Sequence, residues 1–293
     1  MTKTQPPQPP LSGGLNHPPP ARGANRSSPD KGRLGGVAYF VTGTDTGVGK
    51  TLIACALLHG FAAQGKRVVG MKPIAAGGSL RSNGVPTGGD DLAQPLVGCK
   101  SPAKLLLAGA AGCNAEEQNE DVLQLRAAGN VAVGYGQINP YLFLPAIAPH
   151  IAAQRAGVTI NFSRIAQSYQ ELAARADVVI VEGAGGLCVP LNAQQDSAEL
   201  IRELGLPIIL VVGMRLGCLN HALLTVEAIA ARGLTLAGWV ANLIETDMPM
   251  CEENIAALRQ RIAAPLLGTV PYMTRVDARV AAKRLNLELL EQD

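Results

Sequence analysis

The hydrophobic residues of this 293-residue chain gather in six short runs rich in valine and isoleucine. Most runs lack an alternation of polar and apolar residues, which indicates strands buried on both faces of a sheet. We therefore expect strands at residues 37–43, 67–73, 177–183, 207–213, 236–242 and 265–271.

Segments with helical patterning separate several of these strands. We expect helices at residues 50–64, 161–176, 218–232 and 250–262. The repetition of strand, helix and strand predicts the α/β class, with a doubly wound, mostly parallel sheet and helices on both faces. The strand at 67–73 is expected beside the strand at 37–43, and ligands are expected at the carboxyl ends of the strands.

Two regions depart from this pattern. Residues 1–36 are dominated by proline, glycine, serine and charge, so we expect a disordered N-terminal extension. Residues 37–293 are expected to form a single domain. Within it, residues 77–119 show no clear elements, which is uncommon inside a domain and indicates a lid or an insertion.

Composition removes several classes of function. A formal net charge of +2 and an aromatic content of 3% argue against nucleic acid and against an anionic membrane surface. The six cysteines contain no C-x-x-C pair, which argues against a zinc knuckle. The longest apolar run, near 206–214, is far shorter than the ~20 residues of a membrane helix. We therefore expect a cytoplasmic protein.

The segment FVTGTDTGVGKT, residues 40–51, has the pattern of a phosphate-binding loop with one extra residue. Backbone N–H groups of residues 47–51 would converge on phosphate oxygens at the start of the next helix. Lys50 would neutralise the β- and γ-phosphates, and the Thr51 hydroxyl would bind Mg²⁺. The alternative is a glycine-rich turn with an exposed lysine.

Three later segments end strands with polar residues. Lys72 follows one strand, Glu182 ends another before a run of glycines, and Asn242 ends a third. A carboxylate at such a position can hold Mg²⁺, and an asparagine can bind adenine through paired donor and acceptor. The segment RLGCLNH, residues 215–221, would open a helix with free N–H groups for a carboxylate. The alternatives are an exposed lysine, turn residues and an ordinary loop.

Five motifs follow one another in a fixed order: GTDTxVGKT, KPIAAG, NPY with APHIAA, VEGAGG, and LGCxNHALLT with GWVAN. Together they resemble the dethiobiotin synthetase family, a branch of the P-loop NTPase class, over roughly residues 37–273. The resemblance implies a ligase in biotin biosynthesis that acts as a homodimer. It implies that 7,8-diaminononanoate, CO₂ or bicarbonate, and ATP give dethiobiotin, ADP and phosphate through a phosphorylated carbamate.

The resemblance also assigns roles to individual residues. It assigns ATP to Gly47, Val48, Gly49, Lys50, Thr51, Leu52, Asp121, Glu182, Gly183, Ala184, Gly185, Asn242, Leu243, Pro271, Tyr272 and Met273. It assigns the substrate to Thr46, Ala76, Gly217, Cys218 and Asn220, the last three serving the partner subunit. It assigns Mg²⁺ to Thr51, Asp121 and Glu182, and catalysis to Lys72 and Lys50.

Two features leave alternatives open. Asp90 and Asp121 both compete for the Mg²⁺ role, and we prefer Asp121 because residues 119–125 fit the family pattern N-x-D-x-L-x-L. An insertion then spans about residues 78–118, and we favour a disordered bulge over a lid. Ala76 replaces a serine that is common in the family, which puts that substrate contact in doubt.

Two other functions remain to be weighed. A nucleotide-switch ATPase of the partition type shares the loop, but such proteins usually carry an extra lysine early in it, and this chain has none before Lys50 there. A family member that binds without reacting is the second alternative, since Ala76 and the insertion depart from the family pattern.

Overall fold

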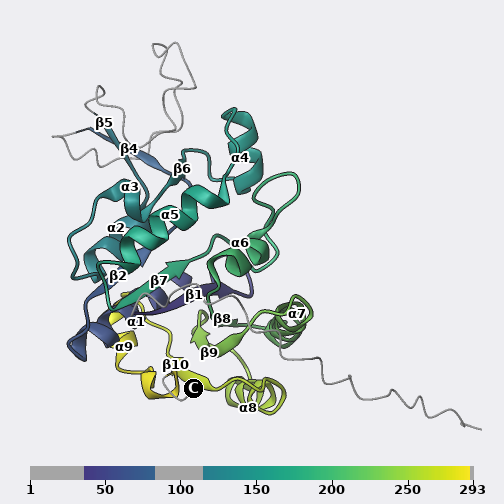
Figure 1. The fold of residues 1–293 in the computed structure, drawn as a ribbon. Coiled ribbons are helices and arrows are strands. Elements are labelled where there is room, and N and C mark those ends of the chain that lie inside the picture. Colours follow the sequence, from purple (N-terminus) through teal and green to yellow (C-terminus); the bar gives the residue numbers. More distant parts are fainter. Residues whose placement is uncertain (1–35, 83–114, 291–293) are drawn as a thin grey trace, which may run out of the picture. The chain divides into compact units, whose positions relative to one another are not determined.

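The computed structural model describes residues 36–82 and 115–290. Six parallel strands form the central sheet in the order β10-β9-β8-β1-β7-β2 (Figure 1). They are β1 (Val37–Gly43), β2 (Val68–Met71), β7 (Val178–Glu182), β8 (Ile208–Met214), β9 (Leu236–Leu243) and β10 (Leu266–Val270). The predicted strands and the predicted fold class are confirmed.

The position of β7 corrects one expectation. β7 pairs with β1 on one side and with β2 on the other, so that Val178 lies opposite both Val37 and Val68. The prediction that β2 lies beside β1 is therefore wrong. Strand neighbours depend on packing between distant segments, which a local pattern does not record. The consequence is that Glu182, the last residue of β7, lies between the ends of β1 and β2.

Helices surround the sheet, and the four that we predicted are present. They are α1 (Lys50–Ala63), α5 (Phe162–Ala173), α7 (Cys218–Ala231) and α8 (Cys251–Arg261). The further helices are α2 (Glu120–Ala128), α3 (Tyr135–Ile138), α4 (Pro149–Arg155), α6 (Ser197–Leu204), α9 (Ala278–Ala282) and the 3₁₀ helix η2 (Leu287–Leu290).

Alternate residues of β1 face the two sides of the sheet. Tyr39 and Val41 pack in a cluster with residues of α1, α2 and α9. Phe40 packs in a second cluster with residues of α4, α5 and α6. A third cluster joins Leu210 and Trp239 to α7 and α8. The buried faces on both sides hold the sheet rigid, so its carboxyl ends form a fixed platform.

Two small sheets lie outside the main one. β3 (Ile74–Ala76) runs parallel to β6 (Tyr141–Phe143), and β4 (Ser79–Ser82) pairs with β5 (Ala115–Gln118) in the antiparallel sense. The expectation that residues 77–119 lack elements is therefore wrong at both ends of that segment. The rest of the predicted insertion, including Asp90, and the predicted extension apart from Gly36 lie outside the described residues.

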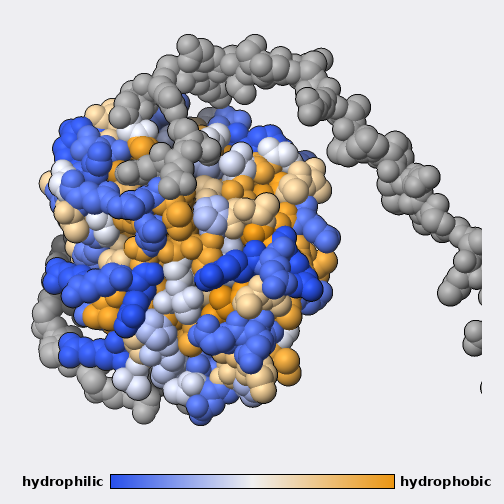
Figure 2. All heavy atoms as spheres, turned by 90° about the horizontal axis from the view of Figure 1, so that it is seen from below, coloured by the Kyte–Doolittle hydropathy of each residue, from blue (hydrophilic) through white to orange (hydrophobic). Residues whose placement is uncertain are grey.

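The surface is of mixed polarity on the face that Figure 2 shows, where hydrophobic side chains lie between hydrophilic ones. Among the described residues, no helix combines the length and apolar character needed to cross a membrane.

Candidate active site

The loop between β1 and α1 requires glycine at position 49. Gly49 has φ of 90° and caps α1 in the left-handed conformation. A Cβ atom there would collide with the side-chain amide of Asn242. That amide donates a hydrogen bond to the Val48 carbonyl at 2.8 Å. Only glycine combines this backbone conformation with so close a neighbour.

The start of α1 is suited to an anion. No side chain caps the helix, and its first turn contains no acidic residue. The first N–H groups of a helix lack partners within the helix, and together with the helix dipole they favour negative charge. Lys50 is 7% exposed, and its Nζ donates to the Asp45 carbonyl at 2.9 Å. The loop thus brings free donors and a cation to one place.

Lys72 joins two carboxylates from distant parts of the chain. Its Nζ lies 2.6 Å from Glu182 Oε1 and 2.7 Å from Asp121 Oδ2. The Thr51 hydroxyl donates to the same Glu182 oxygen at 2.8 Å. Residues of α1, α2, β7 and the end of β2 therefore meet in one cluster, which places four of the predicted site residues together.

Burial and charge act against each other in this cluster. Burial raises the pKa of Glu182, and the Lys72 ammonium offsets part of that rise. Burial acts to lower the pKa of Lys72, but the carboxylates of Glu182 and Asp121 raise it, and the net pKa is raised. For Asp121, burial acts to raise the pKa, but Lys72 outweighs it and the net pKa is lowered. The short contacts and these directions indicate an ammonium held between carboxylates.

The cluster contains ligand types that Mg²⁺ takes in proteins. Glu182 Oε2 is buried and has no hydrogen-bond partner among the described residues, so this oxygen is free to bind a cation. Those residues contain no group of three His, Cys, Asp or Glu side chains that could hold a metal. Two carboxylates and a hydroxyl fit Mg²⁺, which usually keeps waters and takes further ligands from a phosphate substrate.

Hydrogen bonds fix the backbone of Lys72 at both its N–H and its carbonyl. Its N–H donates to the Ile138 carbonyl at 2.9 Å. The side-chain amide of Asn139, which is fully buried, donates to the Lys72 carbonyl at 2.6 Å and to the Tyr141 carbonyl at 3.0 Å. Sequence reasoning included Asn139 in a motif but missed this role. A polar residue before Pro140, between two apolar stretches, was the available signal.

The glycines after β7 permit close packing. A Cβ atom on Gly183 would lie 2.8 Å from the Phe40 ring, and Gly185 has φ of 66°. Ala184 lies between them and is half-buried. The chain therefore leaves the sheet closely packed against β1, beside the cluster that contains Glu182.

The residues predicted to contact substrate lie in three places. Thr46 is exposed in the phosphate loop, and Ala76 ends β3. Gly217 and Asn220 are exposed at the start of α7. Cys218 differs, because its side chain is 2% exposed and its N–H donates to the Arg215 carbonyl at 3.0 Å.

The remaining predicted ATP residues follow the outer strands. Asn242 and Leu243 end β9, and residues 271–273 follow β10. Asn242 is 4% exposed, and its amide nitrogen is engaged by the Val48 carbonyl. Tyr272 is 43% exposed and Met273 packs against the cluster that contains α1.

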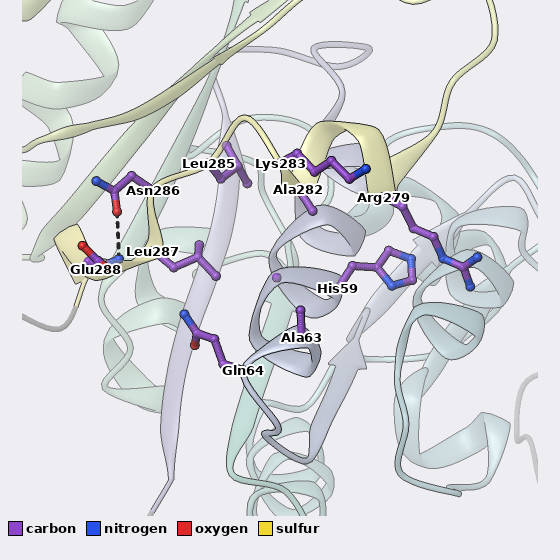
Figure 3. A pocket seen from close by; sticks show the side chains of 11 residues that line it. His59, Ala63, Gln64, Arg279, Ala282, Lys283, Leu285, Asn286, Leu287 and Glu288 are labelled. Carbon is purple, nitrogen blue, oxygen red and sulfur yellow. Dashed lines mark hydrogen bonds between the residues drawn. The ribbon is translucent and has the colours of Figure 1, made fainter.

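Figure 3 shows the side chains that line a cavity beside α1. The volume of this cavity is about 540 Å³. It is lined by the C-terminal half of α1, including His59, and by the segment from Arg279 to Glu288. His59 lies about 13.5 Å from Lys50 along the helix, at 1.5 Å per residue. This cavity is therefore separate from the loop that would hold phosphate.

A second cavity, of about 520 Å³, lies closer to the predicted ATP residues. It shares His59 and Arg279 with the first cavity and reaches Leu52 and Val276. Leu52 is itself a predicted ATP residue, and Val276 follows the predicted segment 271–273 by three positions. Of the predicted ATP residues, all of which lie in the described ranges, Leu52 alone lines this cavity.

Comparison with known proteins gives the family. A family described as an AAA domain matches residues 37–280. The ATP-dependent dethiobiotin synthetase of Aromatoleum aromaticum is 50% identical over 85% of this chain and 97% of its own. The corresponding enzyme of Nitrosospira multiformis is 49% identical over 86% and 96%.

Solved structures are more distant. A chain of the MinC:MinD cell division complex of Aquifex aeolicus has 12% identity and a TM-score of 0.46, over 84% of this chain and 86% of that one. The sequence relatives are much more similar and cover nearly their whole length. The chain belongs to the dethiobiotin synthetase family.

Proposed function

We propose that this chain is an ATP-dependent dethiobiotin synthetase. The observation that carries the proposal is the position of Lys72, 2.6 Å and 2.7 Å from two carboxylates and beside a phosphate-binding loop. Family membership names the reaction, since the relatives are dethiobiotin synthetases. The proposed substrates are 7,8-diaminononanoate, CO₂ or bicarbonate, and ATP.

ATP would bind with its phosphates at the start of α1. Gly47 to Leu52 would surround the phosphates, and Lys50 would exchange its contact with the Asp45 carbonyl for phosphate oxygens. Gly183 to Gly185 would approach the phosphates from β7. Asn242, Leu243 and residues 271–273 would contact the base.

Mg²⁺ would be held by Thr51, Asp121 and Glu182. The free Glu182 Oε2 supports this assignment. The ion would neutralise phosphate charge when bound. Lys72 contacts both of these carboxylates in the structure, so we expect its ammonium to turn toward the substrate once they bind the ion.

The reaction would use position and charge more than covalent help. An amine of the diamine takes up CO₂ and loses a proton to form a carbamate, and a carbamate oxygen attacks the γ-phosphorus while the bond to ADP breaks. The second amine then attacks the carbonyl carbon of this mixed anhydride, loses a proton and displaces phosphate, which closes the ring. Lys72 and Lys50 would stabilise the negative charge on the transferred phosphoryl group.

The substrate site would be shared in a homodimer. Gly217, Cys218 and Asn220 would present the start of α7 to the substrate carboxylate of the partner subunit, while Thr46 and Ala76 would contact the substrate in their own subunit. Leu216 is 96% exposed and Leu224 on α7 is 56% exposed, which supports a contact there. We place the chain in the cytoplasm, with residues 37–293 as one domain and residues 1–36 as an extension.

A coupled assay of ADP release tests the function. We expect release only when the diamine and bicarbonate are both present. ATP hydrolysis that the diamine leaves unchanged would contradict the proposal. It would favour the switch ATPase, which the relatives at up to 50% identity do not favour. Binding of ATP and diamine without release would favour a family member that does not react.

A further inference from the structure

An ion pair connects two loops that both carry predicted ligand-binding residues. Arg215 Nη2 lies 2.5 Å from Asp45 Oδ2. Asp45 belongs to the phosphate loop, next to Thr46, and Arg215 lies two positions before Gly217, the cap of α7. The two residues are 170 positions apart, so the contact depends on the fold.

All three oxygen atoms of Asp45 accept hydrogen bonds. Its carbonyl accepts from Lys50 Nζ at 2.9 Å, and its Oδ1 accepts from the Thr46 N–H at 2.7 Å. The Arg215 guanidinium takes the remaining carboxylate oxygen. Displacement of Arg215 would therefore shift Asp45, and the shift of Asp45 would alter its contact with Lys50.

Arg215 is held by its own loop as well. Its carbonyl accepts from the Cys218 N–H at 3.0 Å, within the turn that begins α7. Arg215 thus has its side chain on the phosphate loop and its backbone in the turn that presents Gly217 and Asn220.

The contribution of this ion pair to folding stability is small. The side chains are 35% and 46% exposed, and ion pairs with such exposure contribute little to folding. The pair lies at the carboxyl ends of β1 and β8, where the predicted ligands bind, and it joins the loops that follow these neighbouring strands. A role in ligand binding agrees with this position.

We infer that the Arg215–Asp45 ion pair positions the phosphate loop against the start of α7, so that ATP and the substrate carboxylate strengthen each other's binding. The inference rests on the proposed function. In the proposed homodimer, the start of α7 serves the partner subunit. The pair then connects the nucleotide of one subunit with the substrate of the other.

Calorimetry measures this coupling directly. The dissociation constant of a non-hydrolysable ATP analogue with Mg²⁺ is determined with and without saturating 7,8-diaminononanoate. We expect the diamine to tighten binding of the analogue by roughly 5-fold or more in the unaltered chain, as is usual for coupled sites. In R215M and D45N we expect the diamine to change the dissociation constant of the analogue by less than about 2-fold.

Three variants sharpen the test. R215K keeps a cation and should retain part of the coupling. The double variant R215M/D45N should lose no more than either single variant, because the two side chains act as one unit. Asn at position 45 keeps the oxygen that accepts from the Thr46 N–H, so D45N removes the charge and leaves that bond.

The Arg67–Asp177 pair provides a matched control. Its atoms lie 2.7 Å apart and its side chains are 62% and 37% exposed. It lies at the opposite edge of the sheet, just before β2 and β7. R67M should therefore leave the coupling factor unchanged.

The possible failures are distinguishable. If the unaltered chain turns over but R215M couples as well as it does, only this inference is wrong. If R215M weakens diamine binding in the absence of nucleotide and D45N does not, Arg215 is a direct ligand and the inference is wrong. A chain that neither binds the diamine nor releases ADP contradicts the proposed function as well.

Discussion

The ammonium of Lys72 lies between two carboxylates that would otherwise repel each other. In Lys72→Met, Glu182 would lose its cation while remaining buried, and the transferred phosphoryl group would lose a positive charge. We expect turnover in the ADP-release assay to fall about 100-fold or more, as for other single electrostatic groups. We also expect a lower melting temperature, because an unpaired buried charge is unfavourable.

Lys66→Met is the control for that variant. Lys66 is exposed and lies two residues before β2, away from the carboxyl ends of the strands. We expect unchanged turnover. Full activity of Lys72→Met would show that the cluster has no part in catalysis.

Asp121 and Asp90 can be separated by one pair of variants. Asp121 contacts Lys72 at 2.7 Å, and Asp90 lies outside the described residues. We expect Asp121→Asn to abolish Mg²⁺-dependent turnover at every Mg²⁺ concentration in a titration, and Asp90→Asn to have little effect. The reverse result would mean that our alignment of the insertion is wrong.

Cys55 gives a test of burial through its acidity. Burial raises the pKa of Cys55 to about 12. A thiol with a raised pKa stays protonated until the pH approaches that value, so at pH 8 only about one molecule in 10⁴ carries the reactive thiolate. Cys188 is exposed. We expect N-ethylmaleimide at pH 8 to modify Cys188 well before Cys55, as measured by peptide mass spectrometry. Equal rates in the folded protein would contradict the packing of α1.

At the scale of elements, the turn into α1 can be tested by a glycine substitution. Gly49 has φ of 90° and Asn242 fills the space where a Cβ would lie. We expect Gly49→Ala to weaken binding of the ATP analogue by at least about 10-fold, which is about 1.4 kcal/mol, and to lower the melting temperature. Calorimetry and thermal unfolding measure these effects.

Gly65, just beyond the other end of α1, is the matched control. It also has positive φ, 80°, but a Cβ atom there would meet nothing within 4 Å. Gly65→Ala should therefore lower the free energy of unfolding by only about 1 kcal/mol, the cost of alanine at positive φ. Nucleotide binding should be unchanged. Equal binding losses in the two variants would contradict the role of the Asn242 contact.

The elements differ in how far local sequence predicts them. The strands of the main sheet were predictable because they are continuous apolar runs, as in β8, where every residue is buried. The helix α6 was missed although signals were present: Asp196 and Glu199 form a capping box and Gly205 ends the helix in the left-handed conformation. The neighbours of β7 were not predictable, because they depend on packing between segments more than a hundred residues apart.

The same limit applies to the site. That Lys50, Thr51, Lys72 and Glu182 lie near one another was predictable, because each lies in a motif at the end of a strand of the sheet. The bond from Asn139 to the Lys72 carbonyl and the contact of Arg215 with Asp45 join residues 67 and 170 positions apart. No spacing within a motif records such contacts, since they follow from the order of strands in the sheet.

At the scale of the whole molecule, the proposed homodimer predicts a sedimentation mass twice that of the 30.4 kDa chain. Leu224→Asp would place a charge on an exposed apolar position of α7. We expect this variant to sediment as a monomer and to lose most of the diamine-dependent turnover, because the substrate site would be incomplete.

Val280→Asp is the comparison for that variant. Val280 is 43% exposed on α9, on the other side of the sheet from α7. We expect it to keep both the dimer mass and the turnover. A monomeric, fully active unaltered chain would overturn the shared site.

The antiparallel pair of β4 and β5 has a consequence for engineering. Ser82 pairs with Ala115, so the two ends of the predicted insertion leave the domain side by side. Each doubling of a flexible loop adds only about 0.6 kcal/mol of closure entropy, and a two-residue Asn-Gly turn could join such a pair directly. The pair of positions 82 and 115 is therefore a suitable site for inserting another domain. A reporter domain could replace residues 83–114 there without moving Asp121.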